Sequence, residues 1–225
     1  ASPFALERWA AFFANFGQFA KGFFYTLGIS IGALIVALLL GLIFGAMSST
    51  HNKVLRGISR VYVEIFQNTP LLVQFVVVFY GISILTDGHV MIPISLTAIL
   101  CVGVYTGAYI SEIIRTGIEA VPKGQTEAAL SQGFTYADTM RIIILPQAVR
   151  TILPPLTNQV VNLIKNTSTV AIISGADIMF TAKAWAYDTT NYVPAFAGAA
   201  FLYFIMCFPL ATWARRKEEE NKKAY

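Results

Sequence analysis

The stretch "EAALSQGFTYADTMRIIILP", residues 127–146, is a polar interruption in a chain that is otherwise strongly apolar. It opens with three good helix formers, Glu127, Ala128 and Ala129, and Gly133 follows where a glycine commonly ends a helix. The small side chains of this segment would let another surface come close. The spacing therefore predicts a short helix with an accessible face.

A second helix is expected directly after the glycine. Thr135 and Asp138 have the spacing of a capping box, in which a side chain satisfies a free backbone N–H at the start of a helix. We expect this second helix to stop or kink near Pro146, because proline lacks a backbone N–H. Residues 127–146 are thus predicted to form a compact helix–turn–helix rather than a flexible connector.

The composition of the whole chain indicates a membrane protein. Its 225 residues are 56% hydrophobic and 12% charged, whereas a soluble domain carries about 25% charged residues. Cys101 and Cys207 lie in apolar runs and are interpreted as small buried hydrophobic residues, and no metal-ligand spacing occurs. No nucleic-acid binding and no metal site are expected.

Five stretches approach the 20 or so apolar residues that a membrane-spanning helix needs. They are residues 23–47, 61–85, 93–114, 149–171 and 194–214. The first and last are uninterrupted, whereas the second and fourth contain polar breaks. The predicted fold is an all-α integral membrane protein with five transmembrane helices.

The distribution of lysine and arginine sets the expected orientation, because cytoplasmic loops are enriched in both. Twelve of the sixteen basic residues fall in residues 48–60, residues 115–150 and the tail after residue 214, whereas the alternate segments hold Arg8, Lys21 and Lys183. The N-terminus is therefore expected outside the cell. The C-terminus and the helix–turn–helix are expected in the cytoplasm.

The chain is expected to have three parts. Aromatic residues at helical spacing in residues 1–22 predict an amphipathic helix on the outer face of the membrane, with an extension of the first span as the alternative. Residues 23–215 form the transmembrane domain and include the cytoplasmic loop 115–148. Residues 216–225 form a charged cytoplasmic tail.

The helix–turn–helix resembles the EAA loop of ABC-transporter permease subunits. The matching residues are Glu127, Ala128, Ala129, Gly133, Ile143, Leu145 and Pro146. Residues 22–30, 68–74, 105–129 and 145–159 are also similar to the polar amino-acid uptake branch of that family. The resemblance implies a fold like that of type I ABC importers, in which these seven residues couple the permease to its ATPase.

The resemblance also implies a set of partners in the bacterial cytoplasmic (inner) membrane. They are a dimer of ABC ATPase subunits, a second permease subunit that is identical or homologous, an extracellular or periplasmic substrate-binding protein, and the lipid bilayer. The sequence has no GxxxxGK[ST] phosphate loop. ATP and Mg²⁺ are therefore assigned to the ATPase, and the chain itself is expected to be no enzyme and to hold no cofactor.

The two polar breaks, "QNTPLL" (67–72) and "LIKNTSTV" (163–170), need an explanation of their own. In lipid, backbone groups freed by a break must find partners or line a cavity. Counted along straight helices, Pro70 lies about 14 Å and Lys165 about 22 Å from the cytoplasmic edge. Both positions fall in the middle third of the membrane, where broken helices indicate a transport site.

The predicted substrate-binding residues are Gln67, Asn68, Thr69, Lys165, Asn166, Thr167 and Ser168. Lys165 would balance the α-carboxylate of an amino acid, with snorkelling to the surface or a structural pairing as alternatives. The pairs Arg60–Glu64 and Glu112–Arg115 have helical spacing and are interpreted as structural or gating clamps.

The sequence therefore predicts a permease subunit of an ATP-driven importer of polar amino acids. Neutral or acidic substrates such as glutamine or glutamate are favoured, because no carboxylate lies at pocket depth to bind a cationic one. The alternatives are a permease of the same architecture for another solute, such as methionine or an opine, an ion-coupled secondary transporter or channel, and a membrane sensor or scaffold. Residues 174–193 would form either a landing face for the binding protein or a cap on the last two spans.

Overall fold

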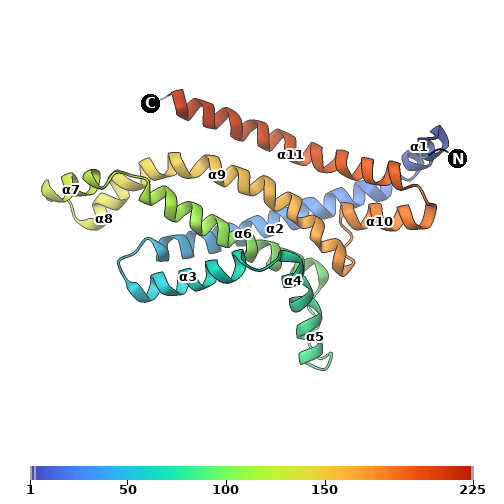
Figure 1. Ribbon diagram of the computed structural model, residues 1–225, viewed down its shortest axis with the longest axis horizontal. Coiled ribbons are helices and arrows are strands. Elements are labelled where there is room, and N and C mark those ends of the chain that lie inside the picture. Colours follow the sequence, from blue (N-terminus) through green and yellow to red (C-terminus); the bar gives the residue numbers. More distant parts are fainter. Residues whose placement is uncertain (1, 3, 224–225) are drawn as a thin grey trace.

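The computed structural model describes residue 2 and residues 4–223, the last three as backbone only, and these residues form helices joined by turns. Five long helices lie roughly along one axis (Figure 1). They are α2 (Phe16–Ser48), α3 (Lys53–Gln67), α6 (Ile94–Glu119), α9 (Leu145–Asn166) and α11 (Tyr192–Lys223). Residues 1 and 3 of the predicted outer segment and residues 224–225 of the predicted tail lie outside the described residues.

Shorter helices mark the two ends of this bundle. At one end lie α7 (Lys123–Ser131) and α8 (Tyr136–Asp138), and at the other lie α1 (Leu6–Ala14) and α10 (Ile178–Thr189) (Figure 1). The helix–turn–helix and the N-terminal segment are therefore separated by the length of the bundle.

Within the described residues, three helices are long and apolar enough to cross a membrane, namely α2, α6 and α11 as far as Glu220. A fourth span results if α3 and residues 71–85 are taken as one broken helix. The molecule is thus an all-helical membrane protein with three to four candidate spans. The fifth predicted span, α9, is less apolar because it carries polar side chains such as Arg150, Gln159 and Lys165, and it stays a prediction.

Close packing of α2 on α6 forms the centre of the bundle, and glycines allow it. A Cβ atom at Gly41 would lie 2.4 Å from Cγ2 of Ile110, and one at Gly103 would lie 2.7 Å from Cβ of Val36. Larger residues at either position would push the helices apart. The absence of side chains at these two glycines therefore allows the close approach of α2 and α6.

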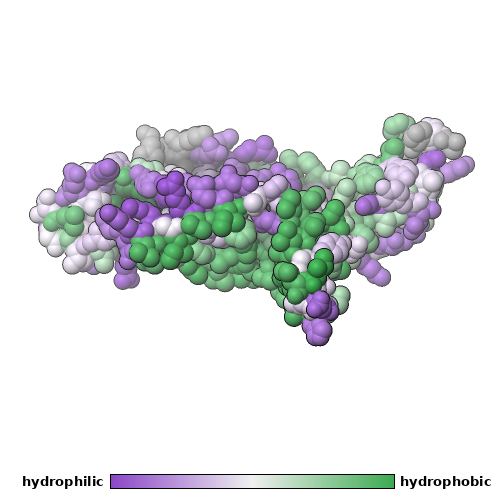
Figure 2. Space-filling model, turned by 60° about the horizontal axis from the view of Figure 1, so that its bottom comes forward, coloured by the Kyte–Doolittle hydropathy of each residue, from purple (hydrophilic) through white to green (hydrophobic). Residues whose placement is uncertain are grey.

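The second predicted span turns sharply at its break. The chain leaves α3 and continues through α4 (Leu71–Val76), a π-helical segment (Val77–Gly81) and α5 (Ile82–Leu85), bent by 97° from α3. These three segments form an arm that projects from the bundle (Figure 1). Figure 2 shows that the arm is largely hydrophobic and that its tip is hydrophilic.

At the N-terminal end, aromatic side chains join α1, α2 and α10. Phe12 is 4% exposed, and its ring centroid lies 4.8 Å from that of Phe19 and 6.0 Å from that of Trp185. The predicted outer segment 1–22 is divided, because α1 ends at Ala14 and the long helix α2 already begins at Phe16. Its second part therefore extends the first span, which was the alternative interpretation.

Candidate functional site

The first helix of the helix–turn–helix ends as the sequence predicts. Gly133 has a φ of +87°, in the left-handed region that favours glycine. The Phe134 N–H donates to the Ala129 carbonyl at 3.2 Å, and the Gly133 N–H donates to the Leu130 carbonyl at 3.0 Å. These two bonds form a Schellman motif, which satisfies carbonyls at a helix end. The helix itself begins earlier than expected, at Lys123.

The second helix begins with the predicted cap but does not end at Pro146. The Asp138 N–H donates to Oγ1 of Thr135 at 3.2 Å, and that hydroxyl donates to Oδ2 of Asp138 at 2.6 Å. The helix then continues as a π-helix over Thr139–Ile144 and becomes α-helical again as α9. Pro146 lies at the second residue of α9, directly after the π-helical segment, so that the helix passes through this proline.

The face of α7 that points away from the bundle is built from the expected small residues. Glu127 and Ala128 are exposed, whereas Ala129 is 3% exposed and packs toward the π-helical segment. Leu130 and Ile142 are 46% and 58% exposed. Of the other matching residues, Ile143 is half-buried, and Leu145 and Pro146 are exposed. Residues 127–146 thus present a rigid, partly apolar surface at the end of the bundle.

At the first break, side chains bind the backbone of their own helix. The Asn68 Nδ2 atom donates to the Glu64 carbonyl at 2.8 Å, and the Thr69 hydroxyl donates to the Ile65 carbonyl at 2.8 Å. Gln67 instead reaches the neighbouring helix α6, where its Nε2 atom donates to the Ala108 carbonyl at 3.2 Å. The predicted site residues at this break are therefore engaged in the fold, and a role in substrate binding stays a prediction.

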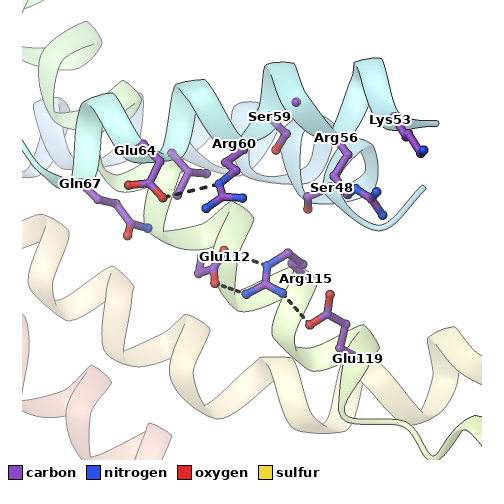
Figure 3. Close-up of a pocket in the computed structure, with 12 residues that line it drawn as sticks. Ser48, Lys53, Arg56, Ser59, Arg60, Glu64, Gln67, Glu112, Arg115 and Glu119 are labelled. Carbon is purple, nitrogen blue, oxygen red and sulfur yellow. Dashed lines mark hydrogen bonds and ion pairs between the residues drawn. The ribbon is translucent and has the colours of Figure 1, made fainter. Parts of the chain in front are cut away.

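A cavity of about 520 Å³ extends from the end of α2 to this break, between α3 and α6. Figure 3 shows charged side chains of α3 and α6 on its two sides. It is lined by Ser48, Lys53, Arg56, Gly57, Ser59, Arg60, Val63, Glu64, Gln67, Glu112, Arg115 and Glu119. Its lining holds four basic and three acidic side chains, so that both signs of charge lie along its length.

Both predicted clamps exist in this cavity. The Arg60 Nε atom lies 3.8 Å from Glu64 Oε1, and the pair is largely exposed, so that its contribution to stability is small. Arg115 binds Glu112 on its own helix and also Glu119 one turn further on. Each pair belongs to one helix, and no ion pair between α3 and α6 occurs among the described residues.

At the second break, the chain tightens but does not turn away. The α-helix ends at Asn166 and continues as a 3-10 helix over Thr167–Ile173. Thr167 is fully buried and donates to the Ile164 carbonyl at 2.6 Å, and the Ser168 hydroxyl donates to the Lys165 carbonyl at 2.7 Å. Asn166 is partly buried.

Lys165 differs from its neighbours because it has no ion pair within the part of the chain that the structure describes. It is exposed and, with Ser168, lines a second cavity of about 280 Å³. Met179 of α10 and Phe196, Ala199, Ala200 and Tyr203 of α11 complete that cavity. Gln67 thus lines one cavity, and Lys165 and Ser168 line another.

A buried carboxylate anchors the segment beyond the second break. Asp177 is 1% exposed and caps α10, accepting hydrogen bonds from the backbone N–H groups of Met179 at 2.9 Å and Phe180 at 3.4 Å. The Tyr203 hydroxyl also donates to it at 3.4 Å. Burial raises the pKa of this carboxyl to about 6, although these hydrogen bonds oppose the shift. On the outer side of α10, Lys183, Tyr187 and Asp188 remain exposed.

The sequence does not predict several residues of the cavity between α3 and α6. Lys53, Arg56 and Ser59 belong to the first two turns of α3, where the basic residues predict a connecting loop. The available signal was Asn52, whose side chain accepts hydrogen bonds from the N–H groups of Val54 and Leu55 and so begins the helix at Lys53.

Comparisons with known proteins agree with this architecture. Residues 37–218 match the family described as "Binding-protein-dependent transport system inner membrane component". The chain is 37% identical to a probable glutamine ABC transporter permease protein, GlnM, of Bacillus subtilis, over 95% of this chain and 97% of that protein. It is 33% identical to the glutamate/aspartate import permease protein GltJ of Escherichia coli, over 84% and 85% of the two chains.

Among solved structures, the chain is similar to that of an amino acid ABC transporter crystallised with histidines. The TM-score is 0.86 at 31% sequence identity, and the match covers 94% of this chain and 98% of that one. The similarity therefore extends over nearly the whole bundle.

Proposed function

This chain belongs to the family of binding-protein-dependent transport inner membrane components, and from that membership we propose that it forms the translocation pathway of an ATP-driven importer of polar amino acids. It is the permease subunit, a non-catalytic membrane component. The observation that carries the proposal is the rigid helix α7, which presents Glu127 and Ala128 outward and ends at the left-handed Gly133.

The proposed topology has five spans, with α9 as the fourth. Its 22 residues extend about 33 Å, enough for a hydrocarbon core of about 30 Å. The N-terminal segment 1–22 would lie at the outer face, residues 23–215 would form the membrane domain, and the tail 216–225 would be cytoplasmic. The separation of α7 from α1 and α10 by the length of the bundle supports this orientation (Figure 1).

We propose that α7 docks on a separate ABC ATPase, which holds ATP and Mg²⁺. Since α7 follows α6 after a short turn and packs against the π-helical segment that leads into α9, a displacement of α7 would move both helices. The exposed apolar residues Leu130 and Ile142 would be covered by the ATPase. The coupling residues are the seven that match the EAA loop.

The cavity between α3 and α6 would be the cytoplasmic part of the pathway, completed by a second permease subunit. A polar cavity that begins beside Ser48 and reaches Gln67 at the break supports this role. Gln67, Asn68, Thr69 and the segment Lys165–Ser168 are proposed to form the substrate site. A binding protein would deliver the substrate at the end of the bundle where α10 exposes Lys183 and Tyr187.

Glutamine and glutamate are the proposed substrates. The names of the similar permeases from Bacillus subtilis and Escherichia coli refer to glutamine and to glutamate/aspartate. The unpaired ammonium of Lys165 suits an α-carboxylate or a side-chain carboxylate. No acidic side chain lines the Lys165 cavity, which disfavours cationic amino acids.

The test compares Gly124 in α7 with Gly133 in the turn that ends it, in a reconstituted complex with ATPase and binding protein. Neither glycine has an atom within 4 Å of an added Cβ, but Gly133 alone has a left-handed φ. We expect Gly133→Asp to lose ATPase binding and amino-acid-stimulated ATP hydrolysis, because the Schellman motif is strained. Gly124→Asp, the matched control, should keep both.

Membrane insertion, measured by the yield of folded protein, should be equal for the two variants. Normal transport by Gly133→Asp would contradict the docking role of α7. ATP hydrolysis by the wild-type complex that responds to no amino acid would contradict the proposed substrate class.

A further inference from the structure

The break between α3 and α4 leaves consecutive carbonyls without their usual helical donors. The Phe66 carbonyl would normally accept from the N–H of the residue four positions on, which is Pro70 and has none. The 97° turn begins at the same place. A proline alone removes a bond and causes a kink, but it does not fix the direction of the chain beyond it.

Side chains bind the carbonyls at the end of α3. The Thr69 hydroxyl binds the Ile65 carbonyl, as described above, and Asn68 Nδ2 binds the Glu64 carbonyl, which also keeps its helical bond from the Asn68 N–H at 3.2 Å. Gln74, from the first turn of α4, returns across the break. Its Nε2 atom lies 3.3 Å from the Phe66 carbonyl, 3.2 Å from the Thr69 carbonyl and 2.8 Å from Oγ1 of Thr69. We call Asn68, Thr69 and Gln74 the carbonyl clasp.

We propose that Gln74 is a positioning residue that holds the break as a fixed elbow and thereby sets the geometry of residues 66–69. It is the member of the clasp that joins the two sides, because Asn68 and Thr69 donate only to carbonyls of α3, whereas Gln74 donates from α4. Its one amide group binds the Phe66 carbonyl near the end of α3 and also Thr69, the residue before Pro70.

The hydrogen-bond donors of a side-chain amide explain why position 74 holds a glutamine. Only the –NH₂ end of Gln74 takes part, and Oε1 is buried with no hydrogen-bond partner among the described residues. A methionine would fill similar space but donate nothing, and a glutamate would turn a carboxylate oxygen toward the carbonyls. The clasp therefore depends on a donor at this position rather than on side-chain volume.

The bend between α3 and the arm can be measured as a distance between two spin labels, without any assay of transport. Val54 on α3 and Leu85 at the end of the arm are 69% and 85% exposed and would carry spin labels, with Cys101 and Cys207 replaced by alanine. A bend of 97° predicts a separation of about 29 Å, whereas a straight helix predicts about 46 Å. Dilution with unlabelled chain keeps the measured distances within one molecule.

We expect one narrow distance distribution for the wild type, and a broad one extending to longer distances for both Gln74→Met and Gln74→Glu. Leu72→Met is the matched control, since that side chain is exposed and makes none of these bonds, and it should match the wild type. If the Gln74→Met protein cannot be produced in folded form, the distances of the Gln74→Glu protein test the proposal. A narrow distribution in the Gln74 variants, or an equal broadening in Leu72→Met, overturns the proposal.

The consequence for transport rests on the proposed function. In vesicles containing the complex, Gln74→Met should raise the apparent KM for amino acid about tenfold, as for one or two lost hydrogen bonds, while the maximal ATPase rate stays near that of Leu72→Met. An unchanged KM with a broadened distance contradicts the positioning role. If the wild type itself transports no amino acid, the proposed function is contradicted. The spin-label distances then still test whether Gln74 holds the bend between α3 and the arm.

Discussion

The two interrupted helices respond to their polar residues in different ways. At the first break the chain turns by 97°, and Thr69 and Gln74 of the carbonyl clasp bind the freed carbonyls of Ile65 and Phe66. At the second, the chain goes on without a gap as a 3-10 helix, and Thr167 and Ser168 bind carbonyls of the turn before them. The two breaks differ in proline, which occurs at the first break and is absent from residues 163–170.

The polar residues at the two breaks fall into two groups: those whose side chains bind backbone carbonyls, and those whose side chains are available to a ligand. Asn68 and Thr69 are occupied by backbone carbonyls, and so is the hydroxyl of Thr167. Lys165 has no such partner and lines a cavity. In a membrane, polar side chains often donate hydrogen bonds to backbone carbonyls that have lost their helical partners. A charged side chain without such a bond is therefore the stronger candidate for substrate contact.

The largest effect is expected from Pro70→Ala, which would make the two breaks alike. The new N–H can donate to the Phe66 carbonyl and the ring clash disappears, so that the straight form gains about 3 kcal/mol, or about 100-fold in population. We expect the label distance between α3 and the arm to lengthen and uptake to be nearly lost.

Pro93→Ala is the matched control for that variant. Like Pro70, Pro93 precedes a helix with extended backbone angles, but a turn rather than a helix comes before it. It should keep both the distance and the uptake. Wild-type transport by Pro70→Ala with an unchanged elbow would show that the clasp alone, rather than the proline, fixes the bend.

A smaller effect is expected from Lys165→Met, which removes the free charge at the second break and leaves the backbone bonds in place. If Lys165 binds a substrate carboxylate, the loss of a charged hydrogen bond of about 1.5–3 kcal/mol should raise the apparent KM about 10- to 100-fold. Lys21→Met, at an exposed position of α2 outside the proposed sites, is the control and should leave the KM unchanged.

Assembly of the complex should be unaffected in both lysine variants, because an apolar side chain inserts into a membrane more easily than a charged one. An unchanged KM in Lys165→Met would remove this residue from the substrate site. The second break would then resemble the first, with all its polar groups serving the fold.

Local chemistry made part of this molecule predictable. The Gly133 helix end, the Thr135–Asp138 cap and the positions of both breaks follow from residue types at fixed short spacings, and each occurs in the structure. The same reasoning placed Pro70 in the broken helix, since proline acts on its own turn.

What could not be predicted depends on contacts between distant atoms. The size of the turn at Pro70 depends on where Gln74 finds acceptors, and the basic residues at the start of α3 predict a loop where the structure has a helix. Whether Lys165 meets Gln67 depends on helix packing, and a single chain gives each a different cavity. Sequence spacing specifies neighbours along a helix, whereas cavities arise between helices.

The smallest effect concerns pH and tests how the second break is anchored at its outer end. Burial raises the pKa of Asp177 from 3.8 to about 6, so the folded protein binds this proton more tightly than the unfolded chain does. The contribution of Asp177 to the free energy of unfolding is therefore largest below pH 3.8, and it is lost as the pH rises through about 6. Tyr203 and Tyr25 are the other titratable groups that face it.

We therefore expect the purified permease to melt at a lower temperature at pH 7.5 than at pH 4.5, with about 2 kcal/mol of the difference due to Asp177. Asp177→Asn keeps a capping oxygen for Met179 and Phe180 but cannot ionise, so its melting temperature should depend less on pH. Asp188→Asn, an exposed neighbour on the same helix, controls for general loss of charge. Parallel pH profiles for the wild type and Asp177→Asn would mean that the carboxylate is hydrated in solution. In that case the second break would be held at its outer end by the apolar contacts of α10 and not by its cap.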